Sequence, residues 1–136
     1  MKHRILFIIF ALILLSLSPR HSFSQEALYS ARVVDRTGSE YVLDNFRRYE
    51  YDFFNCRLRD VPFKLSFEQI LSIDFIEEPD ITVKGYTLAT VTSTDGNTSA
   101  VYLSSDAVIV NGTESNYAVE LTIPLGEVKT ITFVRE

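Results

Sequence analysis

The feature that most constrains the fold is an apolar pattern that occurs twice in the chain, at a constant offset of 58 residues. The two segments are FEQILSIDF, at 67–75, and LGEVKTITF, at 125–133. Their apolar positions are Phe67, Ile70, Ile73 and Phe75 in the first segment and Leu125, Val128, Ile131 and Phe133 in the second. The same offset pairs Ala31 with Ala89, Val33 with Val91 and Gly38 with Gly96. Because two unrelated segments would not keep one gapless offset at both ends, we interpret the chain as an internal duplication.

Each copy shows the alternation of a strand that buries one face. Apolar residues recur at every second position in 61–67 and again in 119–123. The spacing of three between Phe67 and Ile70, repeated between Leu125 and Val128, is that of a single helical or 3₁₀ turn before the last strand. The apolar pattern of each copy therefore predicts four strands, one short 3₁₀ turn and a fifth strand. We expect an all-β fold.

Glycine-containing pairs predict where the strands turn back. Thr37-Gly38 and Asp95-Gly96 predict a tight turn between the first two strands of each copy. Asn111-Gly112 predicts a further hairpin turn in the second copy.

This order of elements resembles the small SH3-like and Sm-like barrels, in which a 3₁₀ turn lies between the fourth and fifth strands. The resemblance implies two tandem five-strand barrels, and a shared β-sandwich or barrel core is the alternative. It implies no function, because the basic residue followed by glycine that marks the RNA-contacting end of Sm proteins is absent. Ser72-Ile73-Asp74 and Thr130-Ile131-Thr132 stand in its place. The chain also has no tryptophan for the usual SH3 peptide groove.

The first residues have the pattern of a secretory signal peptide. Lys2, His3 and Arg4 precede the apolar run 5–17, and Ser22-Phe23-Ser24 supplies small residues for cleavage before Gln25. We therefore expect a signal peptide at 1–24, a first repeat at 25–78, a linker at 79–82 and a second repeat at 83–136. The apolar run is shorter than a spanning helix, so we expect export to a periplasm or the exterior, with no permanent membrane anchor after cleavage.

The composition of the exported part excludes several classes of function. Loss of Lys2, Arg4 and Arg20 leaves 10 basic side chains against 18 acidic ones, a formal charge of −8 that disfavours nucleic acid as a partner. Both histidines, His3 and His21, lie in the expected signal peptide, so neither an imidazole base nor a histidine metal ligand remains. We expect no metal and no cofactor. The single cysteine, Cys56, predicts a small buried side chain, with a bridge between two chains as the alternative.

The candidate binding residues lie where the two copies differ most. The segment RRYEYDFF, 47–54, contains Arg47, Arg48, Tyr49 and Tyr51, and Arg57 and Arg59 follow it closely. Tyrosine and arginine are enriched at protein interfaces, so these six residues form the candidate partner-binding set. Alternation in 49–53 favours the opposite interpretation for the aromatic side chains, in which they fill the core between the copies and the arginines pair with Glu50, Asp52 and Asp60 on the solvent side. The arginines are therefore the better binding candidates.

The sequence leaves three functions open. We expect a non-catalytic protein-binding or structural module of the cell envelope, engaging another envelope protein through the arginine region or a free strand edge, with self-association as a further option. A glycan-binding module would use exposed Tyr49, Tyr51 or Tyr102 as stacking platforms. A hydrolase that relies on carboxylates would need two acidic side chains to converge, chosen from Glu50, Asp52, Asp60, Glu77, Glu78 and Asp80. We expect that the protein is not an enzyme.

Overall fold

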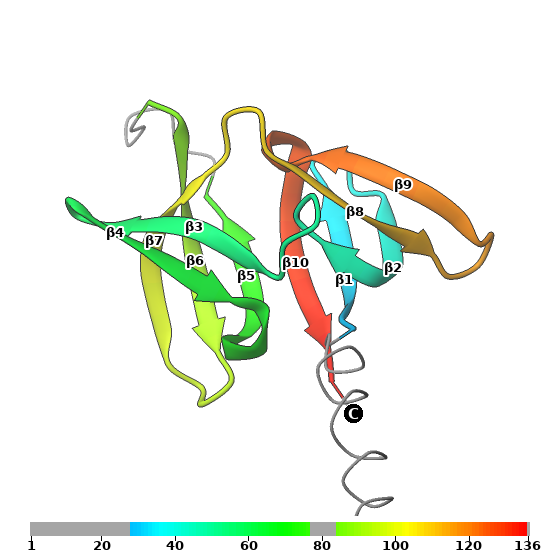
Figure 1. The fold of residues 1–136 in the computed structure, drawn as a ribbon, viewed down its shortest axis with the longest axis horizontal. Coiled ribbons are helices and arrows are strands. Elements are labelled where there is room, and N and C mark those ends of the chain that lie inside the picture. The colour runs from blue at the N-terminus through cyan, green and yellow to red at the C-terminus, as the bar shows by residue number, and fades with distance from the viewer. Residues whose placement is uncertain (1–27, 77–83, 136) are drawn as a thin grey trace, which may run out of the picture.

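Ten antiparallel strands in one sheet make up the described part of the protein, as a computed structural model of the chain shows (Figure 1). The structure describes residues 28–76 and 84–135. The strands are β1 (Ser30–Asp35), β2 (Glu40–Arg47), β3 (Phe53–Leu58), β4 (Val61–Ser66), β5 (Ile70–Phe75), β6 (Tyr86–Ser93), β7 (Thr98–Ser104), β8 (Ile109–Glu114), β9 (Val119–Pro124) and β10 (Val128–Val134). The all-β fold class is therefore confirmed. The expected signal peptide and the expected linker at 79–82 lie outside the described residues.

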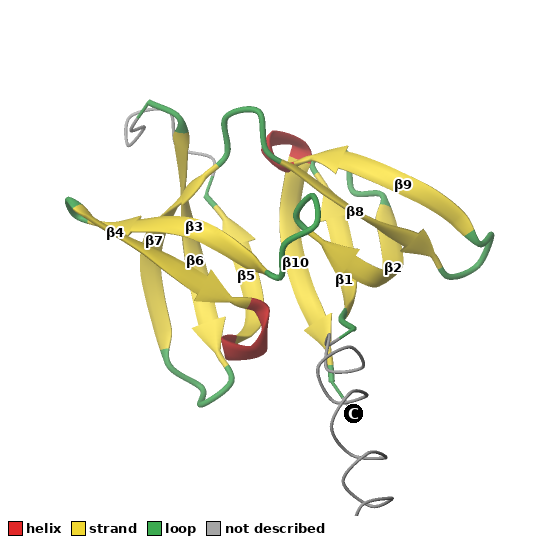
Figure 2. Cartoon of the chain, in the orientation of Figure 1, coloured by secondary structure: helices red, strands yellow, loops and turns green. Residues whose placement is uncertain are grey.

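The two short turns fall where the spacing of three predicts them. Turn η1 (Phe67–Gln69) precedes β5, and turn η3 (Leu125–Glu127) precedes β10 (Figure 2). Both turns are 3₁₀ helices, and their first residues, Phe67 and Leu125, are buried. The hydroxyl of Ser66 accepts a hydrogen bond from the Glu68 amide, which satisfies one of the free N–H groups at the start of η1.

The order of strands in the sheet mixes the two halves of the chain. It runs β4-β3-β7-β6-β5-β10-β1-β2-β8-β9, so β1 and β2 lie between β10 and β8, and β6 and β7 lie between β5 and β3. The sheet curls into two curved halves that meet where β5 pairs with β10, in the middle of Figure 1. The expected tandem of SH3-like barrels is not confirmed, because neither set of five consecutive strands forms a sheet of its own.

One continuous core lies inside the curled sheet. Its buried apolar side chains come from both halves of the chain and form a single cluster. Phe67 lies near the centre of an aromatic group, with ring centroids 5.5 Å from Phe46, 5.0 Å from Phe54 and 5.0 Å from Phe133. Tilted and edge-to-face contacts at this distance stabilise the packing beyond the area that they bury. The alternating apolar residues of both halves of the chain thus pack into one shared core.

The turns agree with the sequence in two places and differ in one. Gly38 and Gly96, both with a φ of 92°, allow tight turns between β1 and β2 and between β6 and β7. Asn111-Gly112, expected to be a turn, lies instead within β8. A Cβ on Gly112 would come within 2.9 Å of the Asp44 carbonyl oxygen, so this glycine is needed for the close approach of β2 and not for a turn.

No helix in the part of the chain that the structure describes is long and apolar enough to cross a bilayer.

Candidate functional site

The candidate site lies at the connection between β2 and β3, where the chain passes from one curved half of the sheet to the other. Arg48 and Tyr51 pair through their backbones, with Arg48 N to Tyr51 O at 3.0 Å and Tyr51 N to Arg48 O at 2.9 Å. Tyr49, between them, has a φ of 59°, which is uncommon for a residue with a side chain. This small loop therefore fixes Arg48 and the two tyrosines in a tight backbone turn.

Arg48 is the central side chain of the site and is only 6% exposed. Its Nε donates a hydrogen bond of 2.7 Å to the Phe53 carbonyl oxygen. Its guanidinium carbon lies 4.9 Å from the centre of the Tyr51 ring and 5.0 Å from the centre of the Phe53 ring. Both distances are within the range of cation–π attraction. Burial lowers the pKa of the Arg48 guanidinium from its ordinary value, although arginine remains charged near neutral pH.

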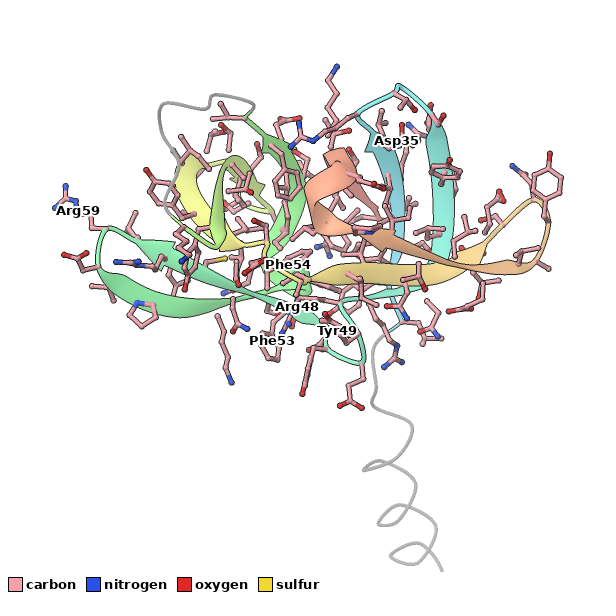
Figure 3. The ribbon with its side chains drawn as sticks, turned by 90° about the horizontal axis from the view of Figure 1, so that it is seen from above. Asp35, Arg48, Tyr49, Phe53, Phe54 and Arg59 are labelled. Atoms are coloured by element: carbon pink, nitrogen blue, oxygen red, sulfur yellow. The ribbon has the colours of Figure 1, made fainter. Side chains whose placement is uncertain are left out.

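Phe53 also carries a second cation. The Lys64 ammonium on β4 lies 4.8 Å from the centre of the Phe53 ring, and the rings of Phe53 and Tyr51 are 5.3 Å apart. Figure 3 shows Arg48, Tyr49 and Phe53 on one side of the sheet and Phe54 on the other, facing the core. We call Arg48, Tyr49, Tyr51, Phe53 and Lys64 the Arg48 cluster.

The two tyrosines of the Arg48 cluster are half-exposed. Tyr49 is 42% and Tyr51 is 43% exposed to solvent. The hydroxyl of Tyr49 donates a hydrogen bond to the carbonyl oxygen of Ala107, in the connection between β7 and β8. The interpretation that these tyrosines fill the core is therefore wrong. Residues 48–52 form a turn and not a strand, so their alternation does not report a buried face; Phe54 and Cys56 are the buried side chains of β3.

The structure separates the arginines that lie close together in sequence. Arg57 bonds Asp60 at 3.0 Å and lies 5.5 Å from the centre of the Tyr86 ring. Arg59 lies at the tip of the turn between β3 and β4, away from Arg48 (Figure 3). Arg47 donates to the side-chain oxygen of Asn45 at 3.1 Å. Of the six candidate residues, Arg48, Tyr49 and Tyr51 share one cluster.

Sequence reasoning missed two members of the Arg48 cluster. Phe53 was considered only as an aromatic of a possible core face, and Lys64 only as a polar residue in the alternation of 61–67. The hairpin between β3 and β4 could have identified Lys64. Its two-residue turn at 59–60 sets the register of β4 against β3 and places Lys64 opposite Asn55. Asn55 and Phe53 lie on the same face of β3, so Lys64 is close to Phe53.

Cys56 and Asp35 each have a pKa that differs from the ordinary value. Of the acidic candidates for a hydrolase, Glu77, Glu78 and Asp80 lie outside the described residues. Cys56 is 2% exposed, and burial raises the pKa of its thiol to about 12, which suits an inert core side chain. A cavity of about 240 Å³ between β2 and β9 has Asp35 and Glu127 in its lining. Oδ1 of Asp35 accepts hydrogen bonds from the Thr37 hydroxyl and the Ser39 amide, and the bond from the Thr37 hydroxyl is the main cause that lowers the pKa of Asp35. A general acid needs a shift in the opposite direction.

Across residues 28–76 and 84–135 no three metal-binding side chains come together. The fold and the site thus define a class: a single-sheet, all-β protein with a cationic and aromatic cluster on its outer surface. Within this class, the chain belongs to a protein family described as "Uncharacterised protein", whose model matches residues 26–136. The match covers all ten strands. No curated protein and no solved structure matches the chain.

Proposed function

We propose that the protein is an exported, non-catalytic binding module that engages an acidic segment of another cell-envelope protein through the Arg48 cluster. The observation that carries this proposal is Arg48 itself: it is almost buried, its guanidinium packs against two rings, and no carboxylate of the described residues pairs with it. Keeping an unpaired charge out of water costs free energy, and a partner carboxylate would offset that cost. The charged N-terminus and apolar run of the sequence support export.

The charges around the cluster suit an acidic partner. Segment 47–66 contains five basic side chains, Arg47, Arg48, Arg57, Arg59 and Lys64, against three acidic ones, Glu50, Asp52 and Asp60. The whole chain has a formal charge of −5, so this segment is a cationic region on an acidic protein. Complementary charge raises the rate of encounter with an acidic partner and disfavours basic ones.

The edge of the sheet lies next to the cluster. β4 is the last strand on its side, and it carries Lys64. An extended peptide can pair with such an edge through main-chain hydrogen bonds while its side chains reach neighbouring groups. A partner strand along β4 would bring alternate side chains to the face that holds Lys64 and Phe53. Main-chain pairing would supply affinity, and the cations would select acidic side chains.

The test is retention of an envelope partner by the immobilised protein. The variants are Tyr49→Ala, Tyr51→Ala and Lys64→Glu, all at exposed side chains, so that folding is kept. The matched controls are Tyr117→Ala, at a tyrosine that is 79% exposed, and Arg32→Ala, in an exposed ion pair with Glu40 away from the cluster. We expect each cluster variant to weaken binding by about 5- to 30-fold, the effect of losing about 1–2 kcal/mol, and the controls to leave binding unchanged.

Salt and unfolding measurements separate a binding role from a structural one. Binding to an acidic partner weakens as salt screens the charges, and Lys64→Glu should make this salt dependence shallower. The urea midpoint of each variant is measured beside its binding. Equal retention by the cluster variants and the controls, or loss of retention only in step with loss of stability, would contradict the proposal.

A glycan-binding module is the second candidate, because the exposure of Tyr49 and Tyr51 leaves their rings accessible. Stacking of sugar rings on these tyrosines would give binding that changes little with salt. Titration with neutral oligosaccharides, with Tyr51→Ala and Tyr117→Ala as the matched pair, distinguishes this candidate from an acidic protein partner.

A further inference from the structure

The two halves of the chain have the same elements in the same order. Strands β1 to β5 with η1 make up the first half, and β6 to β10 with η3 make up the second. In the sheet, however, β1 and β2 pair with β10 and β8, while β6 and β7 pair with β5 and β3. Each curved half of the sheet thus combines two strands from one half of the chain with three from the other.

The pairing of β5 with β10 is symmetric to the residue. Ile73 lies opposite Ile131, its own counterpart at an offset of 58. The flanking pairs, Asp74 with Thr130 and Ser72 with Thr132, exchange with each other under the same offset. A twofold axis that relates the two halves would pass through the pair Ile73 and Ile131.

The pairs beside this axis repeat the same register. The pairs Ala31–Phe133 and Val33–Ile131 on one side match Ala89–Phe75 and Val91–Ile73 on the other. Even the irregularity recurs: the register of β1 against β10 shifts between Val34 and Asp35, and that of β5 against β6 shifts at the corresponding end, between Ile70 and Ser72. A hairpin pair also agrees, because Ala31 lies opposite Leu43 and Ala89 lies opposite Val101.

One strand departs from the offset, for a visible reason. β3 and β4 are joined by two residues, 59–60, whereas β8 and β9 are joined by four, 115–118. The equivalent strands β3 and β8 are therefore 56 residues apart and not 58, so that Phe54 corresponds to Val110 and Cys56 to Gly112. All four are buried. This local shift explains why the two copies seem unrelated in sequence between 47 and 54.

The chain crosses between the curved halves at two equivalent points. The β2–β3 and β7–β8 connections both make this crossing. Tyr49 and Ala107, which are 58 residues apart, have φ values of 59° and 58°, and the Tyr49 hydroxyl donates to the Ala107 carbonyl oxygen. Two left-handed residues at equivalent places are the backbone feature that directs each chain segment across to the other half.

We infer that the protein is a fused pair of copies of one five-strand unit that have exchanged strands. Strands β1 and β2 of the first copy bind β8, β9 and β10 of the second, and β6 and β7 of the second bind β3, β4 and β5 of the first. The first two strands of each copy thus pair with the last three strands of the other copy. Exchange of identical elements is a common route to dimers, and here both partners lie in one chain. A unit of about 50 residues buries too little surface to be stable alone, so the exchange supplies one shared core.

The exchange also makes the outer faces composite. The face that holds the Arg48 cluster combines β3 and β4 of the first copy with β6 and β7 of the second, and Arg57 of β3 reaches the Tyr86 ring of β6 across this boundary. The equivalent face on the other half carries Asp44, which accepts hydrogen bonds from Ser30 and Ser115. The contacts between cations and rings that involve Arg48, Arg57 and Lys64 all lie on the first of these two faces.

Cysteine pairs in the full chain test the exchange. The parent is the full chain with Cys56→Ala and a specific protease site in place of residues 78–82. Arg32 lies opposite Thr132 across β1 and β10, and Thr90 lies opposite Asp74 across β6 and β5. After oxidation and cleavage, we expect the variants Arg32→Cys/Thr132→Cys and Thr90→Cys/Asp74→Cys to hold the two fragments together on a non-reducing gel.

The third variant, Arg32→Cys/Asp74→Cys, is the matched control, since its cysteines would link only if each copy kept its own five strands. Both cysteines lie in the fragment before the cleavage site, so linkage is measured by titration of free thiols in the oxidised, unfolded protein, and we expect two free thiols. With exchange, these positions are separated by β10 and by two residues along the strands, so they lie about 12 Å apart, beyond the reach of a disulfide. The oxidised proteins should run as monomers before cleavage. Linkage in the control variant, linkage in neither of the first two variants, or linkage between separate chains would overturn the inference.

Discussion

Replacement of Phe67 gives the most direct measure of how far the two halves depend on one core. Phe67 is fully buried in η1, and its ring contacts Phe46 and Phe54 from the first half of the chain and Phe133 from the second. Truncation of a buried phenylalanine to alanine costs about 3–5 kcal/mol of unfolding free energy, because the favourable free energy of burying the ring is lost and a cavity remains. We expect Phe67→Ala to lower the free energy of unfolding by this amount.

The assay is urea unfolding of residues 25–136, followed by circular dichroism. With a slope of about 1.5 kcal/mol per molar urea, the midpoint should fall by about 2–3 M and the slope should stay constant. Because total stability is only about 5–15 kcal/mol, Phe67→Leu is measured beside it, with an expected loss of about 1–2 kcal/mol. Leu125→Ala, at the equivalent position in η3, should cost about 2–5 kcal/mol.

A shared core requires that the whole circular dichroism signal move in a single transition. Two transitions, with only the first shifted by Phe67→Ala and only the second by Leu125→Ala, would refute the reasoning. A loss below about 1 kcal/mol for Phe67→Ala would also refute it, since a side chain at the centre of a packed aromatic group cannot be removed at so small a cost.

Three further changes test other parts of the structure. The pKa of Asp35 is lowered from 3.8 in the folded state, so its hydrogen bonds stabilise the fold above the unfolded pKa, and this stability is lost as the pH falls through the folded pKa. Between pH 5 and pH 2, the Asp35→Asn variant should therefore lose less unfolding free energy than the wild type in urea titrations. Parallel curves of unfolding free energy against pH for the two proteins would contradict this. Gly112→Ala should cost about 1–3 kcal/mol of unfolding free energy, because its Cβ would meet backbone and side chain at 2.9 Å, whereas Gly126→Ala has open space and should be near neutral; equal urea midpoints for the two would remove this argument. Cys56, buried and with a pKa of about 12, should react with a thiol reagent at pH 8 only as fast as the protein unfolds, and rapid labelling of the native protein would show that its site is open.

Local patterns in the sequence were sufficient for the fold class and for most of the elements. Alternation around Phe63 and Leu121 predicted strands, and the spacing from Phe67 to Ile70 predicted η1. These features depend on neighbours within a few residues, so the sequence carries them directly. Asn111-Gly112 misled because the same dipeptide suits a turn and a close contact between strands, and only the path of β2 distinguishes the two.

The candidate site was predicted in part. Arg48, Tyr49 and Tyr51 were identified from their composition, but the same aromatic spacing also fitted a buried strand. Their exposure follows from a turn at 48–52, which forms because the chain must cross between the two halves there. Arg59 was grouped with them because it is close in sequence, although a two-residue hairpin turn carries it to the far end of β3.

The sequence by itself determined that this chain forms strands, where most of them turn, and that its apolar pattern repeats after 58 residues. Periodicity records which face of each strand is buried, and this is a local property. Only the tertiary structure decided which strands pair, because β1 could satisfy its hydrogen bonds equally well beside β5 or beside β10. The same applies to the Arg48 cluster, whose cations and rings come from β3, β4 and the turn between the halves, and meet only after β3 and β4 have paired.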